Sequence, residues 1–417
     1  MTRHVRTRAG AAGGAAIMVL SGVLVLTQDV VDPASKPLPN PNPTVVKNWG
    51  TLPDGRVWGN TAGVDIGPDG NVWAYDRCGS NSCLNSNLDS IFKFDRKSGQ
   101  MLAGFGGGVV IFPHGIHVDR DGNVWVTDGN DNAPAPERGA GAAAAGARGA
   151  AGATGARGAA GAAGAAGAAG AAGAAGAGRG AAGQSAAAAG AGGGAAALPT
   201  PDPRATKGHQ VFKFSPDGKV LMTIGKPGGA AGTDCCFQPN DVITNAAGEI
   251  FISEGHSGGG RIRKFSKDGK LIKSWGEPGS GPGQFNIPHS LAFDTRGRLF
   301  VADRANHRIQ IFDQEGTFIA EYKQFSRISG LFIDKDDNLY AIDSESSTAR
   351  HPNWKTGVRI GKASEDRVLA FIPPHPNDQP YGAAGEGVAV DLDGNVYGAE
   401  GPISRQAAGG GITKYVK

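Results

Sequence analysis

Short runs of apolar residues alternate with glycine-, aspartate- and asparagine-rich turns along most of the chain. The stretch FPHGIHVDRDGNVWVTD (112–128) shows the unit: an apolar strand of about five residues, a turn, and a second apolar strand that ends in aspartate. This pattern predicts a β-hairpin. The unit recurs as TAGVDIGPDGNVWAYD, QPNDVITNAAGEIFISE, IPHSLAFDTRGRLFVAD, ISGLFIDKDDNLYAID and AAGEGVAVDLDGNVYGAE, which makes six copies.

Two further strands follow most of these hairpins. The third strand reads SIFKF (90–94), QVFKF (210–214), RIRKF (261–265), RIQIF (308–312) or GITKY (411–415), and the fourth lies in segments such as DGKVLMTIG (217–225) and DGKLIKSWG (268–276). Four antiparallel strands in a repeat of roughly 40–50 residues are typical of a propeller blade. Six repeats therefore predict an all-β fold, a six-bladed β-propeller.

The last repeat ends after its third strand, and the chain offers a replacement for the fourth near its other end. VVKNWG (45–50) matches LIKSWG (271–276), which belongs to a fourth strand. We therefore predict that the N-terminal strand closes the last blade and leaves no exposed sheet edge. The predicted propeller spans residues 44–417.

Three segments do not follow the repeat. Residues 1–28 place arginines before an uncharged, apolar run, which is typical of a signal peptide or signal anchor and predicts export. Any membrane contact is expected only through this anchor. Residues 29–43 form a predicted Pro-rich spacer, and the Ala/Gly-rich residues 133–199 form a predicted disordered insertion within blade two.

Charge and cysteine content narrow the possible functions. The formal net charge is +3 without a basic stripe, which predicts no nucleic-acid partner. The four cysteines form two local pairs, and an exported protein favours disulfides, so we predict a bond between Cys78 and Cys83. A zinc site built from all four cysteines is not expected, because C-x-x-C spacing is absent.

Alignment of the six copies on their first strands places one residue per blade at the same position around the channel axis: Ala62, His114, Asn240, His289, Ser329 and Glu386. His114, His289 and Glu386 fall in alternate blades, so their side chains are expected to converge. Two imidazoles and a carboxylate suit zinc or another divalent metal. The alternative is that each histidine fills a strand start and hydrogen-bonds a neighbouring loop.

A second set of polar residues follows the acid that ends each second strand. Arg77 follows Asp76, Arg304 follows Asp303, and His256 lies two residues after Glu254. Arginine can bind a carboxylate through two hydrogen bonds, and histidine can transfer protons near neutral pH. We therefore assign all three to a candidate catalytic group. The alternative is that the arginines form surface ion pairs with the neighbouring aspartates.

Several motifs together resemble a known family. PHGIHVDRDGNVWVTD, HQVFKFSPDGK, QPNDV, RIRKFSKDGKLIKSWGEPGSGPGQFNIPHSLAF and VADRANHRIQIF are similar to the NHL-repeat propeller of peptidyl-α-hydroxyglycine α-amidating lyase, the enzyme that completes C-terminal peptide amidation. The likeness covers residues 44–417 apart from the insertion and is most specific in blades two to four.

This resemblance implies an axial zinc held by three histidines, an arginine that holds the substrate carboxylate, and a tyrosine base. His114 and His289 match two zinc ligands, while Arg77 and Arg304 match two active-site arginines. Glu386 replaces the third histidine ligand. The positions that correspond to the tyrosine, to the aspartate of a structural calcium site and to two disulfide cysteines hold His256, Gly387, Phe300 and Ser257. Gly387 argues against calcium, although Val64 and Ile116 match the positions whose main-chain carbonyls bind it.

Three functions fit these observations. The first is an exported metal-dependent lyase that cleaves the C–N bond of an α-hydroxyglycine, acting on a small peptide or an acyl-glycine-like substrate. The second is a propeller lactonase or esterase that uses an axial metal. The third is a non-catalytic NHL propeller that binds a peptide, protein or glycan, since a fold alone determines no function. The metal triad and the arginines favour an enzyme.

Overall fold

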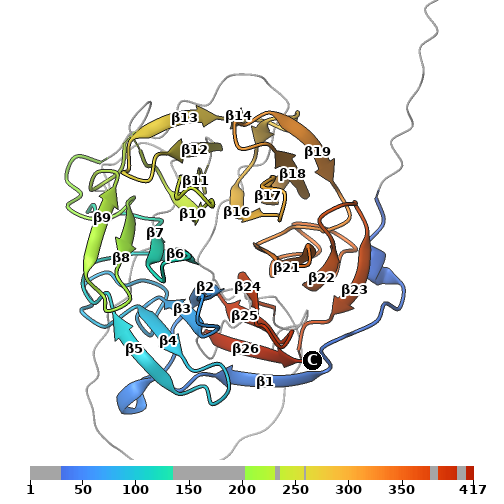
Figure 1. The fold of residues 1–417 in the computed structure, drawn as a ribbon, viewed down its shortest axis with the longest axis horizontal. Helices are drawn as coiled ribbons and strands as arrows, with labels where there is room; N and C mark the ends of the chain where they lie inside the picture. The colour runs from blue at the N-terminus through green and yellow to red at the C-terminus, as the bar shows by residue number, and fades with distance from the viewer. Residues whose placement is uncertain (1–29, 135–201, 231–234, 258–259, 376–383, 402–409) are drawn as a thin grey trace, which may run out of the picture. The chain divides into compact units, whose positions relative to one another are not determined.

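The computed structural model describes residues 30–134, 202–230, 235–257, 260–375, 384–401 and 410–417. Within them, six four-stranded antiparallel sheets surround a central channel as blades, which confirms the predicted six-bladed β-propeller (Figure 1). Residues Val31–Lys417 form one compact unit. No helix among the described residues is both long enough and apolar enough to span a membrane.

The strands of each blade run from the channel outwards in chain order, except in the last blade, where β1 is outermost. Blades one to three contain β2 (Thr61–Ile66), β3 (Val72–Asp76), β4 (Ile91–Phe94) and β5 (Met101–Phe105); β6 (Pro113–Val118), β7 (Val124–Asp128), β8 (Val211–Phe214) and β9 (Val220–Ile224); and β10 (Pro239–Thr244), β11 (Ile250–Glu254), β12 (Arg261–Phe265) and β13 (Leu271–Trp275).

Blades four to six contain β16 (Pro288–Phe293), β17 (Leu299–Asp303), β18 (Arg308–Phe312) and β19 (Phe318–Tyr322); β20 (Gly330–Ile333), β21 (Asn338–Asp343), β22 (Gly357–Lys362) and β23 (Val368–Ile372); and β24 (Gly387–Val390), β25 (Val396–Glu400), β26 (Gly411–Val416) and β1 (Thr44–Trp49). The remaining described elements are the parallel pair β14 (Glu277–Pro278) and β15 (Gln284–Phe285), and the 3-10 turns η1 (Pro33–Ser35), η2 (Pro53–Gly55) and η3 (Arg304–Asn306).

The N-terminal strand closes the ring as the sequence match predicts. β1 pairs with β26 in an antiparallel register in which Thr44 lies opposite Val416 and Val46 opposite Lys414 (Figure 1). The outer edge of β26 is thereby covered, and the two ends of the propeller are held together by main-chain hydrogen bonds.

Deletion of residues 44–50 is expected to open this ring. The edge of β26 would then present unpaired main-chain groups, so we expect lower solubility and less cooperative unfolding than in the intact chain. Circular dichroism melts and light scattering measure both properties. A truncated protein that melts as sharply as the intact protein and stays monomeric would contradict this account of closure.

The turn and the terminal acid of each repeat have separate structural roles. In the blade-two hairpin, Asp119 Oδ1 accepts hydrogen bonds from the main-chain nitrogens of Asp121 and Asn123, which holds the turn. Asp128 ends β7 and accepts hydrogen bonds from the nitrogens of Ile111 and Phe112, at 3.0 and 2.7 Å. It therefore ties the segment before the first strand to the end of the second.

Glycine after the channel-lining histidine allows the first strands of neighbouring blades to approach closely. A Cβ atom at Gly115 would lie 2.6 Å from the carbonyl oxygen of Asn240 in the next blade. Where Asp241 replaces this glycine in blade three, its Oδ2 accepts hydrogen bonds from Ser290 Oγ and the nitrogen of Leu291 in blade four. Small residues and these hydrogen bonds hold the first strands of neighbouring blades together.

The hydrophobic core lies between adjacent blades. One cluster joins Trp73 and Tyr75 of β3 to Val126 of β7 and Phe214 of β8. Full burial of each large apolar side chain stabilises the fold by about 1.5–3 kcal/mol. The aromatic residues of these strands therefore pack successive blades against each other.

The Pro-rich segment expected to be a spacer packs against blade five. Asp32 is buried and pairs with Arg359 of β22, with 2.8 Å between Oδ1 and Nη2. Lys355 Nζ donates to the carbonyl of Ala34, and the nitrogen of Phe371 donates to the carbonyl of Pro39. The described part of this segment is thus a docked strap, which we call the N-terminal strap (residues 31–43).

Two predicted segments lie outside the described residues. These are residues 1–28 and, apart from its first two residues, the insertion 133–199. In the sequence, the expected insertion falls between Asp128, which ends β7, and Val211, which begins β8.

Candidate metal centre and active site

All six ring positions line one cavity in the channel. The first strands of the blades, β2, β6, β10, β16, β20 and β24, supply or flank these residues, and the cavity contacts Ala62, His114, Asn240, His289, Ser329 and Glu386. The six positions selected by the repeat alignment therefore all face this one cavity.

His114 and His289 are held by equivalent hydrogen bonds. His114 Nδ1 lies 2.8 Å from the carbonyl oxygen of Asn240, and His289 Nδ1 lies 2.6 Å from that of Ser329. A carbonyl only accepts, so each Nδ1 carries the proton and each Nε2 keeps its lone pair. The Nε2 of His289 is buried and hydrogen-bonds to none of the described groups. This arrangement is typical of histidines that bind metals.

The third residue near these two is His256. Its ring centroid lies 5.3 Å from that of His114 and 5.6 Å from that of His289, and one nitrogen of each ring lies within 4.8 Å of one nitrogen of the other two. Among the described residues, Glu386 shares in no such group of candidate ligands. The geometry thus favours His256 as the third ligand, whereas the sequence predicts it as a base.

The three rings are neutral in this environment. Burial holds the pKa of His114 and of His289 well below the usual range, and the positive charge of Arg304 adds to the shift. Burial and then the charge of Arg304 lower the pKa of His256 to about 3. Neutral imidazole is the form that binds a metal, so these residues fit a divalent ion.

Glu386 faces Arg77 instead of the three histidines. Its Oε2 lies 3.9 Å from Arg77 Nη2 and hydrogen-bonds to none of the described groups. The side chain of Arg77 is fixed by three contacts. Its Nε donates to the carbonyl of Pro113 and its Nη1 donates to Asn81. Its guanidinium lies 3.8 Å from the ring centroid of Phe112. Burial raises the pKa of Glu386 although Arg77 opposes the shift.

Arg304 connects the histidines with a second group of charges. It follows Asp303 in η3 and is fully buried, and its Nη2 lies 3.2 Å from His256 Nε2. A guanidinium only donates, so His256 must give up this hydrogen bond to bind an ion through that nitrogen. Arg304 Nε and Nη1 hydrogen-bond to none of the described groups, and Nη1 lies 3.6 Å from Glu345 Oε1.

Three residues of this second group were not predicted from the sequence: Arg327, Glu345 and Arg350. Glu345 lies two residues after the acid that ends β21, which is the position of His256 in blade three. The same rule that selected His256, two residues after the acid that ends the second strand, could therefore have selected Glu345. Arg327 and Arg350 lie in loops outside the repeat, where no pattern marks them.

A disulfide joins Cys78 and Cys83, which confirms the predicted bond. The bonded loop begins directly after Arg77, and the nitrogen of Cys83 donates to the carbonyl of Ile111 in the segment before blade two. The disulfide therefore holds the loop that carries Asn81, a hydrogen-bond partner of Arg77. In the same structure Cys235 and Cys236 are paired with each other, so none of the four described cysteines is a free thiol.

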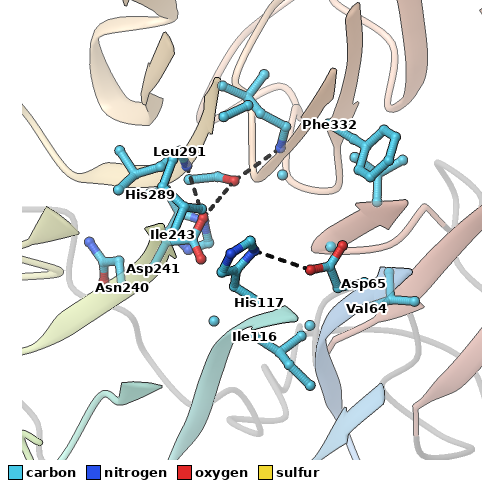
Figure 2. Close-up of a pocket in the computed structure, with 18 of the residues that line it drawn as sticks. Val64, Asp65, Ile116, His117, Asn240, Asp241, Ile243, His289, Leu291 and Phe332 are labelled. Carbon is cyan, nitrogen blue, oxygen red and sulfur yellow. Dashed lines mark hydrogen bonds and ion pairs between the residues drawn. The ribbon is translucent and has the colours of Figure 1, made fainter. Parts of the chain in front are cut away.

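The other end of the cavity has a different character. Figure 2 shows His117 turned towards Asp65, with 3.3 Å between Nδ1 and Oδ2. Its Nε2 lies 3.0 Å from Thr244 Oγ1, so His117 links three blades. Apolar side chains such as Ile243 and Phe332 line the cavity nearby (Figure 2). His117 therefore has partners for both ring nitrogens, unlike His289.

Comparisons with known proteins agree with the repeat analysis. The NHL repeat family model matches residues 285–312 in blade four. The chain is 40% identical to human NHL repeat-containing protein 3 over 183 residues, covering 43% of this chain and 47% of that protein. It is 38% identical to Drosophila melanogaster peptidyl-alpha-hydroxyglycine alpha-amidating lyase 1 over 219 residues, covering 46% and 39%. The chain thus spans less than half of these relatives.

A comparison with solved structures gives only a distant match. XC5397 from Xanthomonas campestris, a gluconolactonase, aligns with 86% of each chain at 13% identity and a TM-score of 0.47. The chain is thus a six-bladed β-propeller that contains an NHL repeat and resembles the peptidyl-α-hydroxyglycine α-amidating lyases.

Proposed function

We propose that the protein is an exported, metal-dependent lyase that cleaves the C–N bond of an N-acyl-α-hydroxyglycine to an amide and glyoxylate. The observation that carries this proposal is the close approach of three neutral histidines next to a buried arginine with unsatisfied donors. Similarity to the Drosophila amidating lyases supports the reaction class. Export rests on the arginine-flanked apolar segment within residues 1–28.

His114, His289 and His256 are the proposed ligands of a divalent ion, with zinc the best match to three imidazoles. When bound, such an ion supplies a Lewis acid that polarises a substrate oxygen. The carbonyls of Asn240 and Ser329 keep the rings of His114 and His289 in the ligating tautomer. This assignment exchanges the sequence-predicted roles of His256 and Glu386.

Arg304 is the proposed partner of the substrate carboxylate. Its Nε and Nη1 are buried and lack hydrogen bonds to the described groups, whereas Arg77 already donates to Pro113 and Asn81. A guanidinium donor can form a charge-assisted hydrogen bond to a carboxylate. Arg304 would thereby orient the scissile bond relative to the histidines beside it. Arg77 would instead position Glu386.

Glu386 is the proposed base. Burial raises its pKa, so its carboxylate is more basic than an exposed glutamate, and its Oε2 is available for a proton. Glu386 would take the proton of the substrate hydroxyl, whose carbon becomes the aldehyde carbon of glyoxylate. The electrons of the C–N bond pass to the amide nitrogen, which receives a proton from Glu386. The reaction thus needs no water and no external reductant.

Turnover of α-hydroxyhippurate tests this function. The zinc-loaded protein is expected to convert it into benzamide and glyoxylate in equal amounts, which chromatography and an aldehyde assay can measure. Hydrolysis of lactones or esters without this reaction would move the assignment to a propeller hydrolase. Inactivity on both substrate classes would favour a binding propeller.

A further inference from the structure

Three arginines surround one buried carboxylate beside the proposed active site. Arg327 Nη2 and Arg350 Nη1 lie 2.8 and 3.0 Å from the carboxylate oxygens of Glu345, and Arg304 Nη1 lies at 3.6 Å. We call Arg304, Arg327 and Arg350 the arginine cluster. Three positive charges against one negative charge leave this group of four side chains with a net charge of +2.

Glu345 is already ionised in this environment, although its Oε1 hydrogen-bonds to none of the described groups. Burial alone would raise its pKa, but Arg304, Arg327 and Arg350 outweigh burial and lower the pKa to about 2. Glu345 is therefore ionised at every physiological pH and cannot gain further negative charge. One arginine would suffice to neutralise it, and each additional guanidinium repels the others.

The donors that remain point to an anionic ligand. Nε and Nη1 of Arg304 lack hydrogen bonds to the described groups although the residue is fully buried. A buried, unsatisfied guanidinium is destabilising unless an anion completes its hydrogen bonds. The other acid nearby, Glu386, is paired with Arg77.

Exposure increases outwards through the cluster. The exposed fraction of the side chain is 1% for Arg304, 10% for Arg327 and 28% for Arg350. Arg304 also touches His256 through Nη2, so the cluster extends from the histidines towards solvent. A substrate whose reacting end lies at the histidines can therefore place a second group against Arg327 and Arg350.

We propose that Arg327 and Arg350, the outer part of the arginine cluster, form a second anion subsite, which selects substrates that carry a carboxylate in addition to the one on the reacting glycine unit. This inference rests on the proposed function and specifies its substrate class as acidic N-acyl-α-hydroxyglycines. Guanidinium groups suit this role because they remain charged and donate paired hydrogen bonds to carboxylates. The first carboxylate binds Arg304, and the second binds Arg327 and Arg350.

Two substrates of equal size test the subsite: α-hydroxyhippurate with a para-carboxylate and the same compound with a para-carboxamide. The expected kcat/KM is at least about tenfold higher for the carboxylate, the factor typical of one hydrogen bond to a charged group. Arg350→Gln is expected to bring the ratio of the two kcat/KM values close to one. Arg296→Gln, a matched loss of charge at an exposed residue in blade four, should leave the ratio unchanged.

Binding of terephthalate and of its monoamide, measured by calorimetry, separates this inference from the proposed reaction. Tighter binding of the dianion, lost in Arg350→Gln, supports the subsite even if neither hippurate is cleaved. Cleavage of both hippurates at equal kcat/KM, with equal binding of dianion and monoamide, overturns the subsite and leaves the lyase standing. Equal binding of terephthalate and its monoamide to the unmodified protein is by itself evidence against the subsite.

Discussion

Replacement of His289 with alanine is expected to remove the bound metal and the lyase activity together. Metal affinity should fall more than about 100-fold, because loss of an outer hydrogen-bond partner alone costs 10–100-fold and His289 is itself a proposed ligand. His114→Ala should behave in the same way, since both rings are fixed by main-chain carbonyls of the next blade. Metal content per chain after dialysis, together with turnover, measures the effect.

His117→Ala is the matched control for His114→Ala, because both histidines lie in β6 and His117 binds Asp65 and Thr244 instead. It should retain the metal. If His114→Ala and His289→Ala both kept a full complement of metal, these histidines would not be metal ligands and the proposed metal site would be wrong.

His256→Ala and Glu386→Gln decide which residue is the third ligand. On the geometry, His256→Ala should weaken metal binding, whereas Glu386→Gln should keep the metal and lower kcat, because glutamine cannot accept the proton. The opposite result would restore the assignment predicted from the ring positions.

Replacement of Asp32 with alanine is expected to destabilise the propeller by about 3–5 kcal/mol, the cost of leaving a buried charge without its partner. Arg359 is completely buried between the rings of Trp354 and Phe371, and Asp32 is its nearest carboxylate. The midpoint of urea unfolding, followed by circular dichroism, should therefore shift to lower urea concentration.

The double variant Asp32→Ala/Arg359→Met controls for this effect. Removal of both charges leaves no unpaired guanidinium, so the double variant should be more stable than Asp32→Ala alone. An unfolding midpoint in Asp32→Ala equal to that of the unmodified protein would show that the strap contributes nothing to the fold.

The strap also illustrates why some features could not be predicted from the pattern. Its prolines and polar residues contain no periodicity, and nothing in the local sequence links Asp32 to Arg359, 327 residues away. The ion pair exists because closure of the ring by β1 places the preceding residues next to blade five. The prediction of a spacer followed from composition, which does not report long-range contacts.

The candidate site was predictable where it followed the repeat. The equivalent positions of His114, His289 and Glu386 are visible in the sequence, because a strand period of two and a six-fold repeat place equivalent residues at one level of the channel. Arg77 and Arg304 could be predicted because each directly follows the aspartate that ends the second strand of its blade. Arg327 and Arg350 lie in irregular loops, and their convergence on Glu345 depends on how those loops fold.

The number of blades, the closing strand and the ring of channel residues could be predicted from the amino-acid pattern, because all three depend on a periodic alternation of apolar and polar positions. The approach of His256 to His114 and His289, and the turn of Glu386 towards Arg77, are visible only in the folded chain. Strand register places the Cα atom of Glu386 on the channel, but the direction of its long side chain depends on burial and on the nearest opposite charge. The repeat therefore locates the site, and the loops between the strands determine its chemistry.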